Sequence, residues 1–590
     1  MVATVLRELQ RRNVIRAAIL YVTGVWALAQ GIVSLGPSLG IPEGATRWFL
    51  VAAAIGFPFW IAFAWFYELT PVGIRRESEV DSDKAILKAT GRRLDFLIIG
   101  VLAVAVVLLL TDRFVRRDQP ASSAAAPVIT EKSVAVLPLV NESGDANALY
   151  FSDGLSEAFI DALSQFPGLK IIARASSFQF RNSKDPVSVI GGKLGVAHLL
   201  EGSVQRAGDA VRISAELIIA KDGTAIWSQH YDRPYKDLFK LQDDITNAVA
   251  TSLKAKLLGG SNAPPPQSER PPSGNLDAYN VYLEGIFYSH RAALEDQRKA
   301  VAAFNTAVRL DPGYAAAWAR LSTAEDNVTS ISGSSAALTQ VMMQARAHAE
   351  KAVALAPDLA LAHNALGNVF DDELNWISAE AQFRQAAQLA PAYAGTRANL
   401  ANLVATLGRP EEAVALLQQA LKLDPLRSLS YSYLAENLMP LGRLDEAETA
   451  IRNAIALRPD GNYFYGRLSQ IDILRGNAKA ALADAQREPT GPFHDIAITL
   501  ALQIGTNRAA ADAALKNLIA KSSDDSPYQI AESYALRKDA DNMFKWLEHA
   551  RTAKDGGLQN LLSDSFILPF RHDPRFAKLC EELKLPAPKG

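Results

Sequence analysis

Long apolar runs dominate the first 117 residues of the chain. They cover residues 17–35, 48–67 and 95–112, and the first two contain no charged side chain. A helix that spans the hydrocarbon core of a membrane needs about 20 mainly apolar residues. The third run is the shortest, and flanking arginines can extend it because their side chains reach back to the headgroups. The pattern predicts three transmembrane helices, with a buried helix pair as the alternative for the first two runs.

Cationic residues predict how this anchor is oriented. Four arginines precede the first run, only Arg47 lies between the first and second, and six Lys and Arg residues stand between the second and third. Cytoplasmic loops are enriched in Lys and Arg. We therefore expect a cytoplasmic N-terminus and an external chain after residue 112. In a bacterium this is a multi-pass inner-membrane protein whose C-terminal domains lie in the periplasm.

After a small polar linker at 118–129, short apolar runs alternate with helical periodicity. The runs at 133–139 and 169–174 read as buried strands, and residues 153–166 place apolar side chains on one helical face. Residues 197–232 form three extended runs separated by turn residues, and 238–258 is amphipathic. We predict a small α/β domain over 130–258 with a mixed or antiparallel sheet.

A proline-rich linker at 259–274 leads into a stretch with helical repeats. Prolines and glycines in this stretch recur 34 residues apart, at Pro357, Pro391, Pro425 and Pro459 and at Gly408, Gly442 and Gly476. A period of 34 is that of the tetratricopeptide (TPR) helix pair, which buries its apolar face only by stacking on its neighbours. Residues 275–590 are therefore predicted to form an all-α TPR solenoid with a C-terminal cap. An insertion around 326–340 predicts a longer helix or loop.

Segments of the first two parts resemble a known family. SVAVLPLVNESGDANALYFSDGLSEAFIDAL, HLLEGSVQRAGDAVRISAELIIAKDGTAIWSQHYD and LFKLQDDI are similar to the TolB amino-terminal-like domain, and YELTPVGI resembles the membrane module of the same group. Members often join this domain to helical repeats, and some carry a cytoplasmic cyclase or DNA-binding domain ahead of the membrane. Few residues precede the first apolar run, so we expect no such domain here. The resemblance implies an envelope protein and no particular activity.

Composition argues against several kinds of chemistry. The net charge of −2 gives no electrostatic reason to expect nucleic acid as a partner. A single cysteine, Cys580, excludes an internal disulfide and is expected to be a small buried residue. The eight histidines show no metal-ligand spacing, GGKLG at 191–195 lacks the phosphate-loop pattern, and no nucleophile elbow occurs. We predict no catalytic residues, no metal and no cofactor, and hence no enzyme.

Three acidic residues form a row along one predicted helix. Asp153, Glu157 and Asp161 follow each other at intervals of four in a predicted helix, so they share one face. We expect a solvated helix face, with contact to a cation or a partner as the alternative.

The remaining candidate site is the concave groove of the solenoid, since such grooves bind peptide segments or helices. Positions on first helices of the repeats are candidate contacts, with a plain solvated face as the alternative: His363, Asn364, Arg397, Asn399, Tyr431 and Tyr433. The expected function is a membrane-anchored periplasmic scaffold for protein–protein interaction, with the lipid bilayer as its second partner. The alternative is a transmembrane signalling subunit whose external α/β domain senses a ligand and acts on a cytoplasmic partner.

Overall fold

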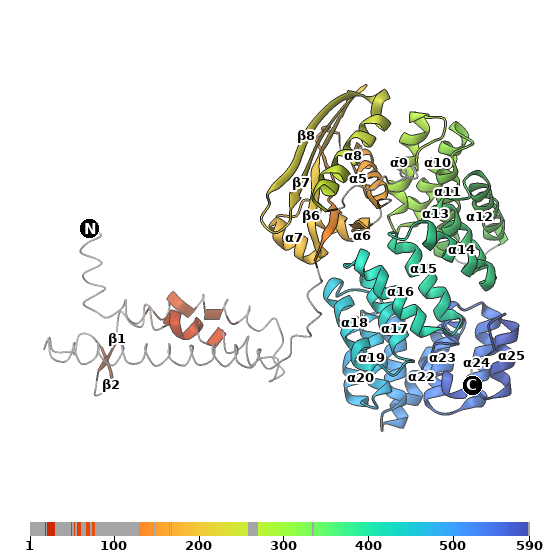
Figure 1. Cartoon of the computed structure of the whole chain (residues 1–590). Helices are drawn as coiled ribbons and strands as arrows, with labels where there is room; N and C mark the ends of the chain where they lie inside the picture. Colours follow the sequence, from red (N-terminus) through yellow and green to blue (C-terminus); the bar gives the residue numbers. More distant parts are fainter. Residues whose placement is uncertain are drawn as a thin grey trace. The chain divides into compact units, whose positions relative to one another are not determined.

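The computed structural model describes residues 129–145, 148–164, 166, 168–257, 269–332 and 336–587, together with short stretches between 18 and 76 (Figure 1). The chain divides into two compact units, residues 1–126 and 127–590. Each unit is described by itself.

In the first unit, described helical residues of the first two apolar runs contact one another. The Tyr21 hydroxyl donates a hydrogen bond to the carbonyl oxygen of Ala53 at 2.8 Å. The Tyr21 ring centroid lies 5.5 Å from that of Phe57 and 5.7 Å from that of Trp60. The two runs therefore pair through an aromatic cluster.

A short antiparallel hairpin follows, made of β1 (Tyr67–Thr70) and β2 (Gly73–Arg76). Among the residues that the structure describes, no helix has both the length and the apolar character needed to cross a bilayer. The predicted span at 95–112 and most of those at 17–35 and 48–67 lie outside the described residues.

The second unit begins with a sheet in the order β5-β3-β6-β7-β8, with β4 beside β6. β3 runs parallel to β5 and β6, whereas β6, β7 and β8 form an antiparallel meander. The predicted mixed sheet is therefore confirmed. Its strands are β3 (Thr130–Val136), β4 (Val140–Asn141), β5 (Lys170–Ile171), β6 (Val196–Ala207), β7 (Ala210–Ile219) and β8 (Ala225–Pro234).

Helices cover both faces of this sheet. α5 (Leu149–Ser164) and α8 (Leu238–Leu257) pack on one face, and α7 (Val187–Leu194) packs on the other. The short α6 (Arg174–Ser177) follows β5 and contacts α5 through Arg174. Alternate β7 residues are buried, as expected for a strand with one packed face. Figure 1 shows α5 and α8 between the sheet and the first helices of the solenoid.

The rest of the unit is a solenoid of antiparallel helix pairs, from α9–α10 to α23–α24, in which each pair stacks on the next. The predicted all-α repeat region is confirmed. The insertion lengthens α11 and α12 to 18 and 20 residues, against 13 and 14 in α13 and α14. The helices are α9 (Leu276–Ser289), α10 (Leu294–Leu310), α11 (Ala315–Ser332), α12 (Ala336–Leu355), α13 (Ala360–Asp372), α14 (Trp376–Leu389), α15 (Ala394–Thr406), α16 (Pro410–Leu423), α17 (Ser428–Leu438), α18 (Leu444–Leu457), α19 (Phe464–Leu474), α20 (Ala478–Ala485), α21 (Pro492–Gln503), α22 (Arg508–Ser522), α23 (Pro527–Leu536), α24 (Ala540–Ala553) and the capping α25 (Pro574–Glu582).

The repeating glycines mark the turn inside three of the helix pairs, α15–α16, α17–α18 and α19–α20. Gly408, Gly442 and Gly476 have φ angles of 71°, 69° and 74°, a left-handed conformation that costs other residues free energy. Leu374, 34 residues before Gly408, adopts φ 55° at the equivalent turn. The sequence period therefore reflects a backbone requirement that most of these repeats meet with glycine.

The α/β domain and the first repeats share one hydrophobic core. A Cβ atom on Gly154 of α5 would lie 2.7 Å from Leu283 of α9, so glycine permits the close approach of the two helices. Phe159 of the domain belongs to the same buried cluster as Tyr282 and Phe304 of the solenoid. Because neither part can cover this surface alone, the domain and the solenoid form a single packed unit.

A second contact lies farther along the solenoid. The backbone N–H of Ala173 donates to the carbonyl oxygen of Leu423 at 2.8 Å, and the Ser176 hydroxyl donates to Asp424 Oδ1 at 2.5 Å. Ser176 Oγ also accepts from the backbone N–H of Leu426 at 2.9 Å. The α/β domain thus contacts the solenoid at α9 and again after α16.

Candidate functional site

The first helices of successive repeats line a cavity of about 300 Å³ in the C-terminal half of the solenoid. α17, α19, α21 and α23 supply its walls, and residues 555–566 supply the remainder. Four aromatic side chains line it, those of Tyr463, Phe493, Tyr528 and Phe566. We call this cavity, with its lining helices, the C-terminal groove.

Tyr463 is held in the wall of the C-terminal groove by an unusual backbone. Its φ is 62°, and its N–H donates to Glu488 Oε1 at 2.5 Å, while the N–H of Gly466 donates to Glu488 Oε2 at 3.0 Å. A non-glycine residue in this conformation persists only where surrounding contacts hold it. The buried Glu488 provides those contacts and places the Tyr463 ring 5.7 Å from that of Phe493.

Arg467 is the cation of the C-terminal groove. Its Nη2 lies 2.9 Å from Glu436 Oε2, and its guanidinium lies 5.6 Å from the centre of the Tyr463 ring. Burial acts to lower the pKa of Arg467, but Glu436 and neighbouring groups raise it, so the charge is retained. Nε of Arg467 has no hydrogen-bond partner among the described residues. One guanidinium donor of Arg467 is therefore buried and unpartnered in the wall of the C-terminal groove.

The buried Glu532 and the half-buried Asp564 lie together in the C-terminal groove. Tyr528 donates its hydroxyl proton to Asp564 Oδ2 at 2.9 Å, and the N–H groups of Phe566 and Ile567 donate to Asp564 Oδ1 at 2.7 and 3.2 Å. Burial raises the pKa of Glu532 well above its usual range, and the adjacent Asp564 raises it further. A protonated Glu532 can donate a hydrogen bond, so the C-terminal groove presents both donors and acceptors beside aromatic surface.

The C-terminal segment closes the solenoid on itself. The indole Nε1 of Trp376, at the start of α14, donates to the carbonyl oxygen of Leu583 at 3.1 Å. A Cβ on Gly408 would lie 3.2 Å from Leu562, and one hydrophobic cluster runs from Trp376 to Leu585. Cys580 is buried in this cluster, and burial raises the pKa of its thiol to about 11. Residues 555–566 of this C-terminal segment supply part of the wall of the C-terminal groove.

The six groove contacts expected from the sequence do not line this cavity: four lie on α13 and α15, and Tyr431 and Tyr433 lie on α17 but not among the lining residues. Asn399 donates to Asn364 Oδ1 at 3.3 Å and to Asn368 Oδ1 at 3.1 Å, which links α15 to α13. His363 is buried between Gln382 Oε1 and the carbonyl oxygen of Pro357, both at 2.7 Å. Their role in binding stays a prediction.

The other three expected contacts, Arg397, Tyr431 and Tyr433, also pack against neighbouring residues of the chain. Arg397 donates through Nε to Gln419 Oε1 at 3.2 Å and lines a crevice beside β3. Tyr431 and Tyr433 are half-buried against the solenoid core, and burial raises the pKa of both. Arg467 lines the C-terminal groove but is not among the contacts expected from the sequence. The repeat period could have identified it, because Asn399, Tyr433 and Arg467 are spaced by 34 residues.

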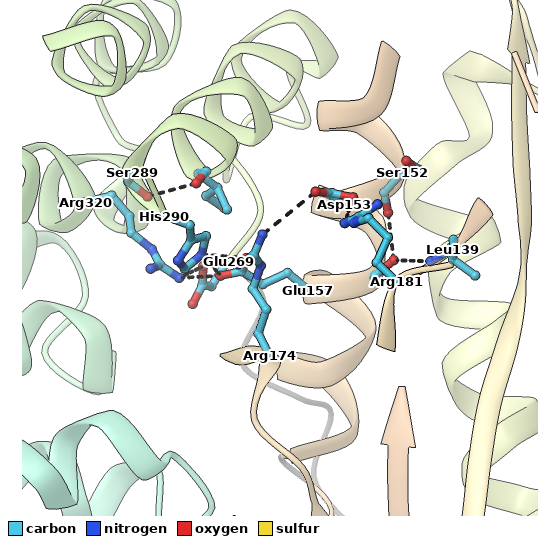
Figure 2. Close-up of polar contacts among 12 residues, drawn as sticks. Leu139, Ser152, Asp153, Glu157, Arg174, Arg181, Glu269, Ser289, His290 and Arg320 are labelled. Atoms are coloured by element: carbon cyan, nitrogen blue, oxygen red, sulfur yellow. Dashed lines mark hydrogen bonds and ion pairs between the residues drawn. The ribbon is translucent and has the colours of Figure 1, made fainter. Parts of the chain in front are cut away.

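A second polar cluster joins the α/β domain to the solenoid (Figure 2). Glu157 of α5 lies 3.0 Å from Arg174 Nε, 3.0 Å from His290 Nε2 and 3.4 Å from Arg320 Nη2. Asp153 lies one turn earlier, 2.5 Å from Arg181 Nη2. We call these residues the interdomain network.

The expectation of a solvated acidic face is wrong for two of its three members. Asp153 and Glu157 are 5% and 6% exposed, because Arg174, Arg181, His290 and Arg320 cover them. Burial acts to raise the pKa of Glu157, but His290, Arg320 and Arg174 hold it well below its usual range. Burial raises the pKa of Asp153 despite Arg181. Glu157 is therefore an ionised centre that links distant parts of the chain.

Comparison with known proteins identifies the repeat type. A family model described as "Tetratricopeptide repeat" matches residues 406–471. The chain contains tetratricopeptide repeats. Over 216 residues it is 34% identical to "Putative adenylate cyclase 3" of Rhizobium meliloti (strain 1021), a match that covers 35% of each chain. The chain thus spans about a third of the length of that relative.

Solved TPR structures are similar at low identity. YrrB, described as a TPR protein with an unusual peptide-binding site, is 18% identical, covers 36% of this chain and 97% of its own, and has a TM-score of 0.27. PilW, a type IV pilus biogenesis factor, is 20% identical over 41% of this chain and 99% of its own, with a TM-score of 0.31. Yeast Tom70 is 15% identical, covers 59% of this chain and 77% of its own, and has a TM-score of 0.33.

Proposed function

We propose that this protein is a non-enzymatic adaptor that binds a segment of a partner protein in the C-terminal groove. The observation that carries the proposal is the cavity lined by Tyr463, Arg467 and Tyr528 on the first helices of stacked repeats. Aromatic and arginine side chains dominate protein-binding hot spots because they combine large contact area with directed hydrogen bonds. TPR repeats themselves favour protein–protein interaction as the coarse function.

We place this adaptor at the inner membrane of a bacterium with its second unit in the periplasm. Support comes from the three apolar runs before residue 113 and from the Lys and Arg residues between the second and third. The similarity of residues 130–258 to the TolB amino-terminal-like domain agrees with an envelope location. Alkaline phosphatase fused after Gly590 is expected to be active, and activity of a cytoplasm-only reporter there would overturn this orientation.

Binding in the C-terminal groove is tested by photo-cross-linking in cells. A benzophenone amino acid replaces Gln529, which lines the cavity, and in a matched strain it replaces Lys545, which is exposed on α24. We expect a discrete adduct from position 529 and none from 545. Adducts of equal yield from both positions, or none from 529, would count against the groove.

A second candidate function is regulation of a signalling enzyme. The observation that favours it is the relative named as a putative adenylate cyclase, together with an interdomain network that couples the α/β domain to the solenoid. In this reading the external domain senses a ligand and a cytoplasmic partner responds.

Affinity capture from solubilised membranes separates the two functions. The fragment for this test starts at residue 127, because a start at 275 would split the core shared by Phe159 and Tyr282. Retention of the same envelope protein by residues 127–590 and by the full chain supports the adaptor. A cyclase or cytoplasmic regulator retained only by the full chain supports the signalling subunit.

A further inference from the structure

A cavity of about 390 Å³ lies where α5 and α8 of the α/β domain meet α9 of the solenoid. Ala158 and Ala162 of α5 line it together with Leu283 and Ile286 of α9. Small-molecule sites in proteins have volumes of about 300–1,000 Å³ and mostly apolar walls with a few placed polar groups. The cavity is separate from the C-terminal groove and shares only Glu157 and Glu269 with the contacts of the interdomain network.

The carboxylates of this cavity differ in how they are paired. Glu157 is paired within the interdomain network, and Asp243 lies 2.8 Å from Arg270. Glu269 accepts the hydroxyl proton of Tyr282 and lies 3.5 Å from Arg320. Asp161 alone among these four acids forms no ion pair or hydrogen bond with a described residue.

A second group in the cavity also lacks a donor. Gln242 is 2% exposed, and its Nε2 donates to the Tyr279 hydroxyl at 2.9 Å. Its Oε1 has no hydrogen-bond partner among the described residues, although Gln242 lines the cavity. A buried acceptor without a donor costs about 1–3 kcal/mol, so native proteins rarely leave one unmatched. The unmatched amide oxygen and the unpaired carboxylate of Asp161 both call for a donor, and the carboxylate favours a positively charged one.

The walls restrict what that donor can be. Tyr279 and Tyr282 are buried aromatic residues beside the aliphatic Leu283 and Ile286, so one side of the cavity favours an apolar body. No group of three His, Cys, Asp or Glu side chains in the described part of the chain is placed to hold a metal ion. An ammonium group has three donors and one positive charge, and aromatic faces attract it.

We propose that this cavity binds a small organic ammonium ion, a primary amine with an apolar body. Its charged end pairs with Asp161 and donates to Gln242 Oε1, and its body packs between Tyr279 and Leu283. Because the walls come from both α5 and α9, the bound amine bridges the α/β domain and the solenoid. Binding to the folded state alone stabilises that state by mass action.

The ionisation of Asp161 agrees with this assignment. Burial raises the pKa of Asp161 well above its usual range, and the neighbouring carboxylates Glu269 and Glu157 raise it further. A cation beside Asp161 removes this penalty, since an adjacent positive charge favours the ionised carboxylate.

The test is calorimetric titration of the purified full chain with 2-phenylethylamine as the probe. 2-Phenylethanol has the same shape without the charge and serves as the ligand control. We expect the amine to bind at least about tenfold more tightly than the alcohol. Equal affinities, or no heat from the amine up to about 10 mM, would overturn the proposal.

Two variants locate the site. Asp161→Asn keeps the size of the side chain and is expected to weaken amine binding at least about tenfold, whereas Asp209→Asn in the exposed β6–β7 turn leaves it unchanged. Ala162→Leu fills the cavity and is expected to abolish binding. Unchanged affinity in Asp161→Asn overturns the assignment. If that variant does not fold, the comparison of amine and alcohol on the unmodified chain, with Ala162→Leu, still decides the question.

Discussion

Removing the charge of Glu157 is the most informative perturbation of this fold. Its side chain is 7% exposed and lies 3.0 Å from both Arg174 Nε and His290 Nε2 and 3.4 Å from Arg320 Nη2. Glu157→Gln preserves the size of the side chain and leaves Arg174 and Arg320 without their shared counter-ion.

The structure also bounds the size of the effect. Removing one partner of a buried ion pair costs about 3–5 kcal/mol. Arg320 keeps Glu269 at 3.5 Å, and Arg174 keeps Asp153 at 3.9 Å, so some compensation remains. We therefore expect the lower end, a loss of about 3 kcal/mol in the free energy of unfolding at pH 7.

The loss should depend on pH with a definite sign. Because the folded-state pKa of Glu157 is lowered from 4.5, its stabilising contribution is fully present above pH 4.5. It decreases as the pH falls from there toward the lowered pKa. The difference between the original chain and Glu157→Gln should therefore shrink below pH 4.5.

Urea unfolding of the full chain, followed by far-UV circular dichroism, measures the effect. The matched control is Glu446→Gln, because Glu446 is 56% exposed and pairs with Arg443 at 2.6 Å on the surface of α18. Exposed pairs contribute about 0–1 kcal/mol, so we expect little change in the control. Equal losses in the two variants would refute the reasoning that the interdomain network holds the two parts together.

Further predictions concern backbone strain and a buried acid. Lys538 is exposed with φ 59°, so Lys538→Gly should raise the free energy of unfolding by about 0.5–1 kcal/mol, since relief of the left-handed conformation exceeds the added chain entropy. Gly476→Ala, at φ 74°, should lower the free energy of unfolding by about 1 kcal/mol. Both variants are measured in the same urea assay, and a lower free energy of unfolding for Lys538→Gly would contradict the strain argument. Burial, and then Asp372, raises the pKa of Asp371 to about 7. The contribution of Asp371 to stability is therefore present below pH 3.8 and is lost as the pH rises to about 7. Asp371→Asn should raise the melting temperature at pH 8 and reduce the loss of stability between pH 3.8 and pH 8. Identical melting temperatures of the variant and the original chain at every pH would disprove this prediction.

The repeats could be predicted from the sequence because their determinants are local. Gly408, Gly442 and Gly476 satisfy a left-handed turn, and a Cβ on Gly367 would lie 2.6 Å from the Phe383 ring of its own helix pair. Such requirements recur at a fixed spacing and are visible in one dimension. The mixed sheet could be predicted for the same reason, since alternation and turn residues specify strands locally.

The candidate sites depend on residues that are far apart in the sequence. Glu157 looked like part of a solvated row, but its partners His290 and Arg320 lie more than 130 positions later and bury it. The 34-residue period relates Arg467 to Asn399 and Tyr433, so its position on the first helix of a repeat could be predicted. The cavity around Arg467 could not be predicted from the sequence. Part of its wall comes from residues 555–566, which lie more than 100 positions after Glu436, another lining residue.

The sequence by itself determined the apolar runs, the α/β domain and the 34-residue helix pairs, because periodicity and turn chemistry act over a few residues. Only the tertiary structure decided that the α/β domain shares its core with the first repeats and that the solenoid closes on its own C-terminal segment. Those contacts place Glu157 between Arg174 and Arg320 and leave Asp161 without an ion pair to a described residue. Burial and charge pairing are properties of the packed chain, so the same three-residue acidic row acquires different chemistry at each position.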